Sequence, residues 1–101
     1  GMLSAVLRMP GLEIDLGRHQ VLRDGQPVEL TAKEWALLRV LALRPERIHT
    51  RESLQGALYG LDGDASSNTL EVFISNLRRK IGRERIQTLR GLGYRLQLGA
   101  A

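Results

Sequence analysis

Side chains that could recognise another molecule gather on a segment of helical periodicity, at about residues 66–82. At about 100° per residue, apolar side chains fall on one stripe of this predicted helix, the pattern of a helix that packs on a core. The opposite face is mainly polar and basic. The predicted core stripe is Leu70, Ile74, Leu77 and Ile81, with Phe73 at its edge. The opposite face carries Val72, Ser75, Asn76 and Arg79, flanked by Glu71, Arg78 and Lys80, with Asn68 and Thr69 at the amino end.

These residue types suit the edges of base pairs in a DNA major groove. Arginine can bind guanine, and asparagine adenine, through two hydrogen bonds, while a small apolar side chain such as Val72 can contact a thymine methyl group. Asn68 and Thr69 lie where free backbone N–H groups favour an anion, so they suit phosphate contacts. The alternative is an amphipathic helix with an ordinary solvated face.

A second basic feature follows this helix in the chain. Residues 86–98 are predicted to form a hairpin, with a turn that contains Gly91 and Gly93 and with Arg90 at its tip. An exposed arginine at the tip of a hairpin can enter a narrow minor groove. A basic hairpin beside a basic helix therefore favours a protein that grips two adjacent grooves of duplex DNA.

The distribution of charge agrees with this interpretation. Residues 1–65 hold eight Lys and Arg against nine Asp and Glu, whereas residues 66–101 hold seven against two. Clustering of positive charge is typical of a surface that binds a polyanion. A solvated basic surface without a partner is the alternative explanation.

Other function classes find little support. The chain is 43% hydrophobic and 26% charged, which is typical of one globular domain. It has no cysteine, and His19 and His49 lie far apart with no further metal ligand at a suitable spacing, so neither a metal site nor a cofactor is expected. No serine, histidine and acid are grouped as a nucleophile with its base, so the protein is not expected to be an enzyme. No apolar run approaches the roughly 20 residues of a membrane span, and a cytoplasmic location is expected.

The segments that must position the helix and the hairpin have clear local signals. Apolar and polar residues alternate over residues 12–16, and Asp24-Gly25 joins two predicted strands at residues 20–23 and 26–30. Thr31 and Glu34 form a capping box that begins a largely apolar helix, which Pro45 ends. Thr50 is predicted to cap a second helix, and residues 60–65 are predicted to form a loop.

Four segments in this order resemble the OmpR/PhoB family of response-regulator effector domains. They are residues 30–38, 50–52, 68–80 and 87–95, and the resemblance extends from about Gly11 to Leu98. It implies an α+β winged helix-turn-helix fold with an N-terminal four-stranded antiparallel sheet, three helices and a C-terminal β-hairpin wing. Residues 10–99 would form the DNA-binding domain, and residues 1–9 would be a tag remnant and linker.

The resemblance also implies roles for individual residues in binding double-stranded DNA. Asn68, Ser75 and Asn76 stand where several relatives carry a basic residue, and Phe73 where they carry histidine, which implies a different base preference. At positions that match the family, Val72, Asn76 and Arg79 would face bases and Arg90 would enter the minor groove. The DNA backbone would be contacted by Asn68, Thr69, Ser75, Arg78, Thr88 and Tyr94, with Tyr59 as a further candidate.

Partners follow from the same resemblance. Such domains bind tandem direct repeats as two protomers and follow an N-terminal receiver domain phosphorylated on aspartate, which would lie outside this chain. The loop with Leu61, Asp62, Gly63 and Asp64 would contact RNA polymerase. Two alternatives stay open at this point: a winged helix that docks an acidic protein instead of DNA, and the same DNA-binding fold joined to a membrane sensor.

Overall fold

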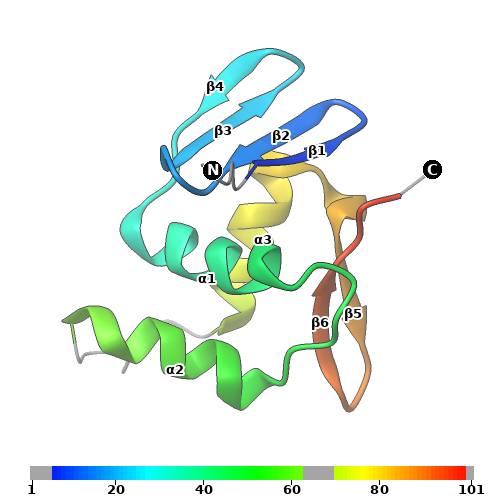
Figure 1. The fold of residues 1–101 in the computed structure, drawn as a ribbon. Coiled ribbons are helices and arrows are strands. Elements are labelled where there is room, and N and C mark those ends of the chain that lie inside the picture. Colours follow the sequence, from blue (N-terminus) through cyan, green and yellow to red (C-terminus); the bar gives the residue numbers. More distant parts are fainter. Residues whose placement is uncertain (1–5, 63–69, 100–101) are drawn as a thin grey trace, which may run out of the picture.

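The computed structural model describes residues 6–62 and 70–99. A four-stranded antiparallel sheet covers one end of the molecule, α1 and α3 lie beneath it, and α2 and a two-stranded hairpin complete the far end (Figure 1). This arrangement confirms the predicted winged helix-turn-helix fold. The elements are β1 (Val6–Met9), β2 (Leu12–Asp15), β3 (Gln20–Arg23), β4 (Gln26–Val28), α1 (Ala32–Leu43), α2 (Arg51–Asp62), α3 (Leu70–Ile81), the 3₁₀ turn η1 (Arg83–Arg85), β5 (Ile86–Leu89) and β6 (Gly93–Leu96).

The sheet is a meander in the order β1-β2-β3-β4. Asp24 and Gly25, with φ of 51° and 81°, form the predicted tight turn between β3 and β4, because both accept the positive φ that this turn requires. The assignment of residues 1–9 to a linker was wrong for residues 6–9. These residues form the edge strand β1, which pairs with β2 and places Met9 in the core opposite Leu12.

Helix α1 begins as predicted and runs through the centre of the core. The Thr31 hydroxyl accepts a hydrogen bond from the Glu34 backbone N–H at 3.2 Å, and the Glu34 carboxylate accepts one from the Thr31 N–H at 2.9 Å. Leu37, Leu38 and Leu41 are fully buried. The first of the three helices therefore connects the sheet to the two helices that follow.

Helix α2 is capped by Thr50, whose hydroxyl accepts a hydrogen bond from the Ser53 N–H at 3.1 Å. The helix continues to Asp62, so the prediction of a loop from residue 60 was wrong for residues 60–62. Gly60 begins the segment that was predicted to be a loop, but a glycine inside a helix costs only about 1 kcal/mol relative to alanine. Continuing a helix that is already formed can offset that cost, because each further residue adds a hydrogen bond without a new nucleation step.

Helix α3 presents its predicted apolar stripe to the core. Leu70, Ile74, Leu77 and Ile81 are all buried, and Phe73 packs at the edge of the core. The helix ends at Gly82, which has a φ of 116° that favours glycine. Residues 66–69, where the predicted helix began, lie outside the described residues.

Candidate nucleic-acid interface

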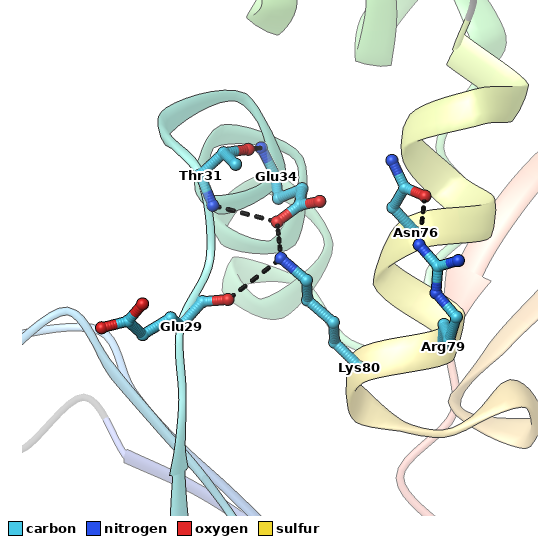
Figure 2. A network of polar contacts seen from close by, with 6 residues as sticks. All are labelled: Glu29, Thr31, Glu34, Asn76, Arg79 and Lys80. Atoms are coloured by element: carbon cyan, nitrogen blue, oxygen red, sulfur yellow. Dashed lines mark hydrogen bonds and ion pairs between the residues drawn. The ribbon is translucent and has the colours of Figure 1, made fainter.

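Burying the apolar stripe of α3 turns its opposite face to solvent. Val72 is 45% exposed, Ser75 and Arg79 are exposed, and Asn76 is half-buried. The Arg79 guanidinium donates a hydrogen bond to the Asn76 side-chain oxygen at 2.8 Å (Figure 2). The residues predicted to face bases therefore point away from the core, and two of them hold each other in position.

The carboxyl end of α3 is fixed to the rest of the domain by two basic side chains. Lys80 donates to the Glu34 carboxylate at 2.7 Å and to the Glu29 carbonyl at 3.0 Å (Figure 2). Arg23, from β3, donates to the carbonyls of Arg79 and Lys80 at 3.2 and 3.1 Å. Positive groups near the last carbonyls of a helix also stabilise it, because they interact favourably with the negative end of the helix dipole. The helix is thus held against both the sheet and the start of α1.

Glu34 is the buried centre of this network, with 3% of its surface exposed. Burial raises the pKa of its carboxyl group, but the hydrogen bonds from Lys80 and Thr31 and the positive charge of Lys80 outweigh that effect. The net result is a pKa below the ordinary value of 4.5. Glu34 is therefore ionised at neutral pH and pairs with Lys80.

Arg78 connects α3 to the hairpin. Its guanidinium donates two hydrogen bonds to the Ile86 carbonyl, at 3.0 and 2.9 Å, and one to the Thr88 hydroxyl. It also lies 6.0 Å from the ring centre of Tyr94. Arg78 and Thr88, both predicted to contact the DNA backbone, are thus bonded to each other and fix the angle between helix and hairpin.

Tyr94, which is predicted to contact the DNA backbone, packs mainly into the protein. It is 6% exposed and belongs to the hydrophobic core, since it faces inward from β6. The backbone of Tyr94 also pairs with His49, which lies just before α2. The ring of Tyr94 therefore stabilises the fold, and its hydroxyl is the group left for a hydrogen bond to a phosphate.

The hairpin of β5 and β6 extends beside the helices and ends in the turn at residues 90–92 (Figure 1). Arg90 is exposed there and forms no hydrogen bond or ion pair with any residue that the structure describes. Its neighbour Leu92 is 59% exposed. Arg90 is thus a cation free to meet a partner, as predicted from its place in the sequence.

The acidic residue within α3 itself is paired with a basic residue of the protein. Glu71, in the first turn of α3, forms an ion pair with Arg51 in the first turn of α2. This pair ties the two helices together at their amino ends. It also places a positive group beside a carboxylate that would otherwise repel a polyanion at this end of the helix.

The chain matches the family described as "Transcriptional regulatory protein, C terminal" over residues 25–96. It is 46% identical over 99 residues to the transcriptional regulatory protein PmrA of Pectobacterium parmentieri, covering 98% of this chain and 45% of that protein. The chain belongs to this family. It is an OmpR/PhoB-type winged-helix effector domain. Domains of this type are the DNA-binding parts of response regulators, which control transcription in two-component systems.

Solved structures of other effector domains share the fold. The DNA-binding domain of CpxR from E. coli superposes with a TM-score of 0.75 at 35% identity, covering 95% of this chain and 98% of that one. The RstA DNA-binding domain of Klebsiella pneumoniae, solved in complex with the RstA box, gives a TM-score of 0.73 at 31% identity over 91% of this chain and 96% of that chain. The chain spans less than half the length of PmrA.

Several predicted contact residues of this effector domain remain predictions. Asn68, Thr69, Gly63 and Asp64 lie outside the described residues, as do the side chains of Tyr59, Leu61 and Asp62. Sequence patterns did not reveal the roles of Lys80 and Arg78, because their partners come from other elements. Within residues 6–62 and 70–99, no group of acids and histidines could hold a metal ion, and no helix is long and apolar enough to cross a membrane.

Proposed function

We propose that this effector domain recognises a specific duplex sequence by placing the exposed face of α3 in the major groove and Arg90 in the neighbouring minor groove. The observation that supports this most directly is that both basic surfaces are open and that Arg78 joins them. A helix and a hairpin held at a fixed angle can engage two adjacent grooves at once. Arginine and asparagine on the helix supply hydrogen bonds to base edges.

The partners of the whole regulator are part of the same proposal. Two copies would bind tandem direct repeats of the site, as the family resemblance implies, and an N-terminal receiver would control their activity. The segment around Leu61, Asp62, Gly63 and Asp64 would contact RNA polymerase. The RstA domain was solved with its own DNA box, which supports duplex DNA as the ligand here. A chromosomal target would place the regulator in the cytoplasm.

Selection of bound duplexes from a random pool, followed by sequencing, tests the proposal. Enrichment of one motif, with an affinity that falls steeply as salt rises, is the expected result. Failure to enrich any sequence, together with binding to an acidic protein, would instead favour a protein-docking module.

Substitution of Asn76 or Arg79 by alanine is expected to relax the preference at one base pair each, by about 1–3 kcal/mol. Because the two side chains are hydrogen-bonded at 2.8 Å, their effects should not be additive. Affinities for the selected duplex and its single-base variants measure this. Arg39→Ala on the exposed side of α1 is a matched loss of charge that should leave every base preference intact. Unchanged preferences in both α3 variants would refute the assignment.

Arg90→Ala is expected to weaken binding to all duplexes, because the wing loses its cation in the minor groove. The loss should be greatest where the flanking sequence is an A-tract, since a narrow minor groove has a stronger negative potential. Titration of duplexes with A·T-rich and G·C-rich flanks measures the difference. Equal affinity of variant and wild type on the A-tract duplex would contradict the minor-groove placement.

A further inference from the structure

A hollow in the surface lies between the carboxyl half of α3 and the start of β5. It is lined by Ser75, Arg78, Arg79, Arg83 and Ile86. Three of these five residues are arginines, and no carboxylate lines the hollow. The described part of the chain therefore leaves a concentration of positive charge here without a counter-charge of its own.

Arg83 is the arginine in this group that has no partner among residues 6–62 and 70–99. It begins η1, immediately after α3, and is exposed. It forms no hydrogen bond or ion pair with any described residue. By contrast, Arg78 is bonded to β5 and Arg79 to Asn76.

We propose that this hollow binds one phosphodiester of the DNA backbone and that Arg83 is its principal charged ligand. This inference rests on the proposed function. The hollow shares Ser75 and Arg79 with the exposed face of α3, so a duplex seated on that face would bring a backbone phosphate alongside. A serine hydroxyl and guanidinium N–H groups are the donors that phosphate oxygens accept.

The position of the hollow explains why several arginines are needed. It lies at the carboxyl end of α3, where the partial charge of the helix is negative and disfavours an anion. The guanidinium groups must therefore supply the attraction. Arg78 and Arg79 are held in place by their own hydrogen bonds, so they contribute fixed charge, while Arg83 is free to bond the phosphate directly.

The salt dependence of duplex binding tests this. If Arg83 neutralises one phosphate, Arg83→Ala should reduce the slope of log K against log salt by about 0.9. The ratio of the wild-type binding constant to that of the Arg83→Ala variant should then fall about 3.5-fold between 50 and 200 mM salt. Base preferences should stay unchanged, and Arg83→Lys should retain the wild-type slope. Arg39→Ala is the matched control for net charge, and its slope should equal that of wild type.

Duplexes with a single neutral methylphosphonate localise the contact. At one position, the neutral linkage should lower the duplex affinity of the wild-type protein but cause no further loss of affinity in the Arg83→Ala variant. A slope for Arg83→Ala equal to that of Arg39→Ala, an altered base preference, or no such position would each overturn the inference while wild type still binds its motif. Absence of any wild-type motif would instead show that the proposed function itself fails.

Discussion

Gly93→Ala is expected to destabilise the domain by about 3 kcal/mol or more, because a side chain at this position would collide with backbone atoms. A Cβ there would lie 2.0 Å from the His49 carbonyl oxygen, 2.8 Å from its carbon and 3.0 Å from the Thr50 Cα. All three atoms belong to the backbone, so the contact cannot be relieved by the movement of a flexible side chain. Gly93 also has a φ of 151°, which L-residues rarely adopt.

The collision would disrupt one of the attachments of the hairpin to the helical body. The His49 N–H donates to the Tyr94 carbonyl at 2.8 Å, and the Tyr94 N–H donates to the His49 carbonyl at 2.9 Å. This pairing holds β6 against the segment that leads into α2. Loss of both bonds would loosen the wing, which Arg78 would still hold at β5, so DNA affinity should fall together with stability.

Urea unfolding of three glycine variants separates the causes. Gly91→Ala, in the turn that precedes Gly93, with a φ of 77° and open space around it, should cost only about 1 kcal/mol from backbone strain. Gly56→Ala, in α2 and also with open space, should stabilise the protein by about 0.5–1 kcal/mol. A cost for Gly93→Ala no greater than that for Gly91→Ala would mean that the close approach to His49 does not matter.

Features set by neighbouring residues could be predicted from the sequence. The capping box of Thr31 and Glu34, the Asp24-Gly25 turn and the apolar stripe of α3 each depend on contacts within a few positions, and each is present. The exposure of Arg90 followed equally from its place in a short turn. Such signals were sufficient for the order of the strands and helices from β2 onward and for the outward face of α3.

Features that depend on distant contacts were missed. Periodicity placed Lys80 and Arg78 on the flanks of the polar face, but long side chains can reach partners on other elements, and here they bond Glu34 and Ile86. The two wing glycines indicated a turn, yet the approach of residue 49 to Gly93 has no local signal. Edge strand β1 was missed because four residues carry too little alternation to distinguish a strand from a linker.

Lys80→Met is expected to destabilise the domain by about 2–3 kcal/mol at pH 7. Removing one partner of a buried ion pair costs about 3–5 kcal/mol, since the other charge is left buried and unpaired. The Glu34 side chain is 4% exposed, but the Lys80 side chain is 31% exposed, so water can replace part of the loss. By contrast, Arg8→Met should cost less than about 1 kcal/mol, because the Arg8–Glu13 pair lies in solvent.

A second substitution shows whether the buried charge is the cause. Glu34→Gln in the Lys80→Met background should recover most of the stability, because glutamine keeps the capping hydrogen bond to Thr31 without a charge. Chemical denaturation of the two single variants and the double variant measures the coupling. If the two single variants change the free energy of unfolding by amounts that simply add in the double variant, Lys80 and Glu34 do not stabilise the fold as an ion pair.

The same pair should make the effect of Lys80→Met depend on pH. The pKa of Glu34 is lowered in the folded wild type, so its ionised form contributes stability that is present above the unfolded value and lost as pH falls through the folded value. Lys80 and Thr31 are the two residues that lower the pKa of Glu34 against the effect of burial. Removing Lys80 leaves only Thr31 to oppose burial, so the pKa of Glu34 is expected to be higher in the variant than in wild type. The stability gap between wild type and variant should therefore be full at pH 7 and close as Glu34 becomes protonated in both proteins. A gap that stays constant down to low pH would mean that Lys80 stabilises α3 through its apolar stem and not through its charge.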